Sequence, residues 1–111
     1  MTGSTITLNK NVNTGTSGTV GLTGNVALDT GDIAVDTSNG GGGTLTITGN
    51  VSGGQNLDLL SGSALTSISG TIGVGTPLTS LDIQQAGTGG VTLSDDIGVT
   101  GTAGAGTTNI G

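Results

Sequence analysis

Aliphatic residues recur along this chain in pairs whose members are separated by one polar or small residue. The pairs begin at positions 6, 20, 33, 45, 57, 81 and 91. In an extended strand, residues i and i+2 lie on the same face, so each pair predicts a short β-strand with one apolar face. Helices are not expected, because Gly occupies 25 of the 111 positions and each Gly disfavours a helix by about 1 kcal/mol relative to Ala.

A longer motif also repeats, and it consists of an aliphatic pair, a polar turn and a third aliphatic residue. It reads T-I-T-L-N-K-N-V at 5–12, T-V-G-L-T-G-N-V at 19–26, T-L-T-I-T-G-N-V at 44–51 and G-V-T-L-S-D-D-I at 90–97, with a degenerate copy, L-T-S-I-S-G-T-I, at 65–72. The strong strands begin at 20, 45, 66 and 91, and a weaker pair falls between successive copies. Successive copies are thus 21–25 residues apart, and a repeat of this length is typical of proteins built from stacked repeats. Each coil is therefore predicted to contain a strong strand with a bent extension and then a weak strand.

Two architectures could use this pattern. An antiparallel meander needs two-residue hairpin turns of the Asn-Gly or Asp-Gly type, whereas Asn39-Gly40 opens a five-residue loop. A parallel solenoid tolerates corners of variable length that are rich in Gly. The sequence therefore predicts an all-β fold: a parallel β-helix (β-solenoid) of about four to five coils, with 21–25 residues per coil, Gly/Asn-rich corners and no helix. Residues 1–111 are expected to form a single segment of a longer array or fibre.

In such a stack, equivalent residues of successive coils lie above one another. The predicted core ladder comprises Ile6, Leu8, Val12, Val20, Leu22, Val26, Ile33, Val35, Leu45, Ile47, Val51, Leu57, Leu59, Ile68, Ile72, Leu81, Ile83, Val91, Leu93 and Ile97. The recurring T-G-N-V places Asn25 below Asn50 in a polar ladder, and Val26 below Val51. Stacked Asn side chains stabilise coiled β arrays.

The amino-acid composition limits both the width of the core and the reactions that the chain could catalyse. The chain has no Phe, Tyr, Trp, Cys or His, which suits a thin aliphatic interior better than a wide one. The net charge of −6 comes from seven Asp and one Lys, so binding to nucleic acid or to anionic membranes is not expected. No apolar run approaches the ~20 residues of a membrane span. Because general bases and nucleophiles are almost absent, we expect no enzyme activity.

The acidic residues offer two candidate sites. Asp29-Thr30-Gly31 resembles the active-site turn of retroviral-type aspartic proteases, in which two carboxylates share a proton, although a strand-ending turn explains it more simply. Asp29, Asp32 and Asp36 could gather with Asp58 or Asp82 in stacked coils and bind Ca²⁺. The plainer interpretation is that these acids keep a β surface soluble. No other cofactor is expected.

Threonine rows suggest an alternative function. The T-x-T at 5–7 and the T-x-T-x-T at 44–48 resemble the arrays of ice-binding solenoids, although Gly21 interrupts the pattern. The alternative to a structural module is thus a binding module that presents a flat Thr-rich face to ice or glycan. High β-propensity of Thr on a solvent-facing surface would explain the same rows without any ligand.

Three further segments carry a resemblance to a known family. They are G-G-Q-N-L-D-L at 53–59, G-T-P-L-T-S-L-D-I at 75–83 and T-G-T-A-G-A-G at 100–106. Together with the repeats, they resemble the Gly/Thr-rich β-strand repeats of large bacterial surface proteins, the filamentous-haemagglutinin-like adhesins and autotransporter-type passengers. The resemblance implies a right-handed parallel β-helix, export to the cell surface, and adhesion to a surface glycan or protein ligand, or a spacer role. It transfers no catalytic residues, and the family's export domain and anchor are not found in these residues.

The leading functional hypothesis is therefore a structural or adhesive module of an extracellular fibre, with its export signal outside these residues. Both ends of a solenoid expose strand edges unless they are capped. The first copy, 5–12, begins in mid-pattern, and 107–110 looks like the start of another strand. We therefore expect the chain to associate with itself end to end.

Overall fold

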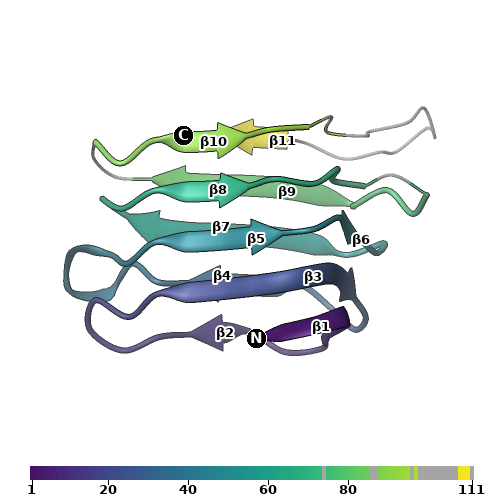
Figure 1. Cartoon of the computed structure of the whole chain (residues 1–111), viewed down its shortest axis with the longest axis horizontal. Helices are drawn as coiled ribbons and strands as arrows, with labels where there is room; N and C mark the ends of the chain where they lie inside the picture. The colour runs from purple at the N-terminus through teal and green to yellow at the C-terminus, as the bar shows by residue number, and fades with distance from the viewer. Residues whose placement is uncertain (74, 86–87, 96, 98–107, 111) are drawn as a thin grey trace.

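The chain forms a β-solenoid of about four turns, in which parallel strands stack into two sheets (Figure 1). The computed structural model describes residues 1–73, 75–85, 88–95 and 97, together with the backbone of 108–110. Every strand pair in the described residues is parallel. The predicted all-β parallel solenoid is thus confirmed. The predicted run at 100–106 and Thr107 lie outside the described residues.

Each coil contributes strands to both sheets, so strands of successive coils stack on one another within each sheet. Sheet A contains β1 (Thr2–Leu8), β3 (Val20–Leu28), β5 (Leu45–Thr48), β8 (Thr66–Ile68) and β10 (Val91–Leu93), with β6 (Val51–Ser52) paired to β3. Sheet B contains β2 (Val12–Asn13), β4 (Ile33–Asp36), β7 (Asn56–Gly62), β9 (Ser80–Gln85) and β11 (Thr108–Ile110). Among the described residues the helical structure is one 3-10 turn, η1 (Asn39–Gly41). Figure 1 shows β1 and β2 at one end of the stack and β10 and β11 at the other.

Each coil has three sides, because the strands of sheet A bend. The first half of β3 pairs with β5 and the second half pairs with β6. In the next two coils this second segment continues as single bridges, Val51 to Ile72 and Ile72 to Ile97. Sheet B closes the coil. A strong strand, a bent extension and a weaker strand were all predicted from the repeat.

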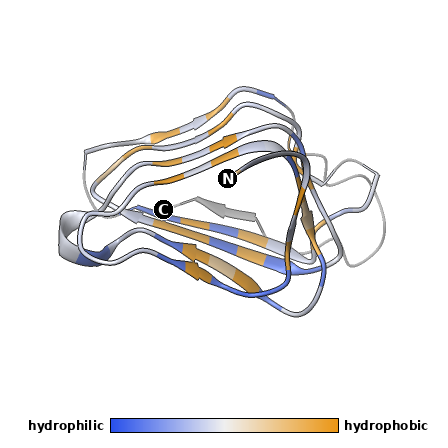
Figure 2. Cartoon of the chain, turned by 60° about the horizontal axis from the view of Figure 1, so that its bottom comes forward, coloured by the Kyte–Doolittle hydropathy of each residue, from blue (hydrophilic) through white to orange (hydrophobic). Residues whose placement is uncertain are grey.

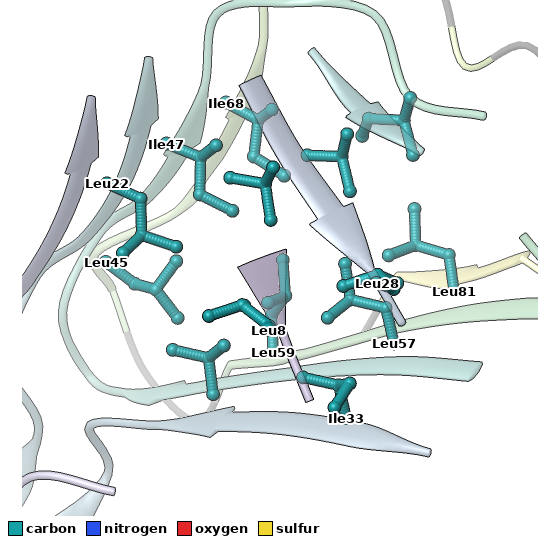
Figure 3. Close-up of a cluster of buried hydrophobic side chains, with 14 of the residues drawn as sticks. Leu8, Leu22, Leu28, Ile33, Leu45, Ile47, Leu57, Leu59, Ile68 and Leu81 are labelled. Carbon is teal, nitrogen blue, oxygen red and sulfur yellow. The ribbon is translucent and has the colours of Figure 1, made fainter. Parts of the chain in front are cut away.

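The core is a narrow column of aliphatic side chains between these three sides. Val26 pairs with Val51 in register, as the T-G-N-V repeat predicted. Figure 3 shows Leu22, Ile47 and Ile68 following one another along sheet A, opposite Ile33, Leu57 and Leu81 of sheet B. In Figure 2, hydrophobic positions recur at the same places in successive coils. Burial of each such side chain contributes about 1.5–3 kcal/mol.

Most of the predicted ladder is buried, and its least buried members lie in the terminal coils. Sixteen members are buried: Ile6, Leu8, Val20, Leu22, Val26, Ile33, Val35, Leu45, Ile47, Val51, Leu57, Leu59, Ile68, Ile72, Leu81 and Ile83. Val12, Val91, Leu93 and Ile97 are partly buried and pack against this core. Val12 lies in the first coil and the other three in the last, and the described residues place a neighbouring coil on one side of each of these two coils.

The first motif copy, 5–12, is not equivalent to the others in space. Its sequence would place Ile6 below Val20, yet Ile6 pairs with Val26 and Leu8 with Leu28. Val12 pairs with Val35 on sheet B. The copies agree in alternation but differ in the turn: those at 19–26, 44–51 and 65–72 have T-G or S-G at the fifth and sixth positions, the copy at 90–97 has S-D, and this first copy has N-K. The first copy occupies the second segment of sheet A and then turns into sheet B.

Some buried residues were not predicted. Leu28 and Leu78 are apolar members of the core, and Thr37, Ser61 and Thr66 are fully buried polar residues. The degenerate copy at 65–72 explains Thr66. Its order is Leu-Thr where the strong copies have Thr followed by an aliphatic residue, so register places Thr66 in the core above Leu45 and leaves Leu65 36% exposed.

Candidate functional site

A column of glycines forms the bend between the two segments of sheet A. Gly24 and Gly49 have φ values of 133° and 137°, a conformation that residues with a Cβ rarely adopt. A Cβ on Gly49 would collide with the carbonyl of Gly24, and its distance to the Gly24 carbonyl carbon would be 2.6 Å. A Cβ on Gly70 would collide with the backbone of Gly49 in the same way. Gly at this corner therefore lets successive coils lie directly over one another.

The Asn residues that follow these glycines form a hydrogen-bonded ladder. The backbone N–H of Asn50 donates to Oδ1 of Asn25 at 3.2 Å, and the N–H of Thr71 donates to Oδ1 of Asn50 at 3.0 Å. Each side chain thus satisfies a backbone donor of the next coil, at a bend where the regular ladder is interrupted. The structure brings together the two residues of the predicted polar ladder and adds Thr71.

The corner from sheet B to sheet A carries a second polar column, which the sequence did not suggest. Thr14 Oγ1 donates to the Gly18 carbonyl at 3.0 Å, and Thr37 Oγ1 donates to the Gly43 carbonyl at 2.6 Å. In a later coil, Gln85 Nε2 donates to the Gly90 carbonyl at 3.2 Å. These bonds tie each corner loop back to its own coil.

The sequence signal for this second column is weak. Thr14, Thr37 and Gln85 follow sheet B strands, but the loops that they close differ in length, with the acceptor four, six and five residues further along. The equivalent residue in the third coil is Ser61, whose buried Oγ has no hydrogen-bond partner in the described part of the chain. A residue type that changes from coil to coil leaves no fixed motif to detect.

The outer face of sheet B is a network of polar side chains bonded between coils. Asn56 Nδ2 donates to Asp32 Oδ1 at 2.8 Å, and Ser80 Oγ donates to Asn56 Oδ1 at 2.8 Å. On a parallel row, Asn13 Nδ2 donates to Asp36 Oδ2 at 3.2 Å. The polar groups of this face are thus used to hold adjacent coils together.

Two carboxylates stack at the centre of this face. Asp58 of β7 pairs in register with Asp82 of β9. Burial, together with the negative charges of Asp82 and Asp32, raises the pKa of Asp58 above its usual value. The pKa of Asp36 is lowered, because the side chain and backbone N–H of Ser38 donate to its carboxylate.

The candidate calcium ligands are spread over one coil. Asp32 precedes β4 and Asp36 is its last residue, with four residue steps of about 3.3 Å between them, and Asp29 lies in the preceding turn. Among the described residues, no three acidic, His or Cys side chains come close enough to hold a metal ion. Asp32 lies close enough to Asp58 to affect its pKa, but the predicted set does not converge. Calcium binding stays a prediction.

The protease-like turn is built into the stack. The backbone N–H of Asp29 donates to the Leu8 carbonyl at 3.0 Å, and Gln55 Nε2 donates to the Asp29 carbonyl at 3.1 Å. Asp29 therefore ends β3 in a turn that is held by coils on both sides. Lys10 is exposed in the corner before β2.

The outer face of sheet A differs from that of sheet B. Most of its outward residues in the first segment are Thr and Ser, with Gly21 and Leu65 among them, and it carries no charged side chain in the described strands β3, β5, β8 and β10. Thr44, Thr46 and Thr48 are exposed along one strand, and the register places Thr46 between Gly21 and Ser67. This surface is a flat hydroxyl array.

Comparison with known proteins does not identify a family. No protein-family model matches the chain, and searches of the curated proteins and of the solved structures gave no match. Within the part of the chain that the structure describes, no helix has the length and apolar character needed to cross a membrane.

Proposed function

We propose that this chain is a structural and adhesive β-solenoid module of an exported fibre, and that it associates end to end through its strand edges. The observation that carries this proposal is the open sheet edge at the N-terminal coil. There, among the described residues, β1 pairs with β3 alone and β2 pairs with β4 alone. Unpaired parallel edges are templates for further strands.

The geometry of β1 supports this association, because it leaves backbone groups available to a second copy. The Leu8 carbonyl accepts a hydrogen bond from the Asp29 N–H in the next coil. Because backbone groups of alternate residues in a parallel strand point to opposite neighbours, the N–H and C=O of Thr7 point away from β3, out of the end of the stack. A head-to-tail contact of this kind does not close on itself and extends into a filament.

The extracellular and adhesive parts of the proposal have a different basis. They are supported by the resemblance to repeats of bacterial surface proteins and by the Gly/Thr-rich, Cys-free composition. The cell surface is accordingly the proposed location, and a surface glycan or protein is the proposed ligand of the fibre. The net charge of −6 favours solubility of the fibre, because like charges on the sides of neighbouring fibres repel one another.

A proline variant tests the association. In Thr7→Pro the outward N–H is removed while the bonds from β1 to β3 remain, which edge strands tolerate. We expect the parent protein to form concentration-dependent oligomers in sedimentation velocity and linear particles in electron micrographs, and Thr7→Pro to sediment as a monomer. Thr7→Val keeps the N–H and is the control. A parent that stays monomeric at high concentration, or a proline variant that still polymerises, contradicts the proposal.

A second candidate function is a binding module that presents the flat Thr-rich face of sheet A to ice or glycan. The observation that favours it is the contrast between the two sheets: polar side chains on sheet B bond to one another, whereas the Thr and Ser hydroxyls on the first segment of sheet A form no such bond among the described residues. Free hydroxyls on a flat face are available to an external ligand.

A further inference from the structure

Three rows of residues cross the outer face of the first segment of sheet A, one residue from each coil. The central row follows the register of the strands, and the flanking rows lie two residues to either side. The rows are Thr19, Thr44, Leu65 and Gly90; Gly21, Thr46, Ser67 and Thr92; and Thr23, Thr48, Ser69 and Ser94. Nine of these twelve positions carry a hydroxyl group.

None of these nine hydroxyls forms a hydrogen bond to a protein atom among the described residues. Elsewhere in the chain, hydroxyls and amides bond to neighbouring coils, as Ser80 bonds to Asn56 and Thr79 bonds to the Gly54 carbonyl. The face is thus not needed for internal hydrogen bonding. Eight of the nine residues are exposed, and Ser67 is partly buried.

The spacing of the rows is set by the backbone. Neighbouring strands lie about 4.8 Å apart, and alternate residues along a parallel strand lie about 6.6 Å apart. The hydroxyls therefore form a two-dimensional grid with a short and a long repeat. Such a grid can bond to a ligand whose own oxygen atoms are ordered in two dimensions.

We propose that this hydroxyl face binds ice, the ordered lattice of water, and the proposal rests on the second candidate function above. None of the twelve positions carries a charge, and the Thr methyl groups lie beside the hydroxyls, so ordered water bound to these rows meets no ion within them. A glycan fits less well, because the chain contains no aromatic residue on which a sugar ring could stack.

This face is compatible with end-to-end association. It runs along the side of the stack, parallel to the direction in which coils are added (Figure 1). Head-to-tail contacts leave it open and would lengthen the grid. Ice binding and self-association can therefore be tested separately.

A loss-of-function pair tests the proposal directly. Thermal hysteresis and the shaping of single ice crystals are measured for the parent chain, for Thr46→Leu combined with Thr48→Leu, and for the control Thr7→Leu, which changes an exposed Thr on the other segment of the sheet. We expect hysteresis in the parent and the control and its loss in the double variant. Far-UV circular dichroism verifies that all three are folded.

A gain-of-function pair gives a result that misfolding cannot produce. A Cβ on Gly21 would meet no atom within 4 Å, so Gly21→Thr fills a gap in the central row. Leu65→Thr fills a gap in the adjacent row. Gly90 is not used, because its φ of 84° would strain any side chain. We expect each substitution to raise the hysteresis above that of the parent.

The outcomes separate the proposal from the function on which it rests. A folded parent that shows neither hysteresis nor ice shaping overturns the ice proposal, as does a Gly21→Thr variant with no gain. If a glycan array instead gives a signal that the Thr46/Thr48 double variant loses, the face is a binding surface but its ligand is not ice. Absence of both signals overturns the binding function itself.

Discussion

Replacement of Gly49 by Ala tests whether the coils lie directly over one another. Gly49 has a φ of 137°, and a Cβ at this position would lie 2.6 Å from the carbonyl carbon of Gly24 in the coil below. The obstacle is backbone, which cannot rotate away as a side chain could. The collision exists only if residues 25 positions apart in sequence are neighbours in space.

The expected cost has two parts. A non-Gly residue in a sparsely populated backbone conformation costs about 1–3 kcal/mol, and overpacking against fixed atoms costs about another 1–3 kcal/mol. The substitution should therefore lower the free energy of unfolding by about 2–6 kcal/mol, a large part of the roughly 5–15 kcal/mol that stabilises a typical domain.

Gly21→Ala is the matched control, because Gly21 lies on the same sheet, has no positive φ and has open space around its Cβ. It should be neutral or stabilising by up to about 1 kcal/mol, since Ala restricts the unfolded chain. Because the chain has no aromatic residue, urea unfolding is followed by far-UV circular dichroism. Equal stability of Gly49→Ala and Gly21→Ala would refute the stacked glycine column.

Three further changes test the ladders. Asn50→Ala leaves the N–H of Thr71 without its acceptor, so the free energy of unfolding should fall by about 0.5–1.5 kcal/mol in the same urea assay. Thr66→Val removes a buried hydroxyl that has no partner among the described residues, so a gain of about 1–3 kcal/mol is expected, and a loss would show that this hydroxyl is satisfied. Asp58→Asn should stabilise the protein at neutral pH by about 0.2–1 kcal/mol, because it removes like charges that lie directly opposite at Asp82. Since the folded-state pKa of Asp58 is raised, its protonation stabilises the fold fully below the usual carboxyl pKa, and this contribution is lost as pH rises through the raised value. Urea titrations across the acid range should therefore show a smaller loss of stability with rising pH in Asp58→Asn than in the parent.

The alternation of aliphatic residues was sufficient to predict most of the fold. Pairs such as Leu45 and Ile47 define strands because side chains alternate between faces, and a repeated T-G-N-V fixes which residues stack. The sequence was less informative where a copy departs from the motif, as at 65–72. Leu65-Thr66 reverses the polar and apolar order, and only the pairing of Thr66 with Leu45 reveals which residue is buried.

The candidate surfaces were harder to predict, because they depend on neighbours from other coils. The sequence suggested Thr rows and an acidic cluster. It could not show that, in the described part of the chain, the polar side chains of sheet B bond between coils whereas the hydroxyls on the first segment of sheet A do not. The same limit explains the three acids Asp29, Asp32 and Asp36, which are close in sequence yet are spread along one coil. Residues a few positions apart on one extended strand are separated by about 3.3 Å per residue, whereas residues in register on neighbouring strands lie about 4.8 Å apart.

The contact between Val26 and Val51 is the most direct test of the parallel stack. These side chains are buried, lie 25 positions apart in sequence and pair in register, so their methyl groups should be separated by about the 4.8 Å between neighbouring strands. Methyl-labelled NMR should show strong nuclear Overhauser effects between Val26 and Val51 and between Val51 and Ile72. An absence of both, with cross-peaks between antiparallel strand neighbours instead, would contradict the solenoid.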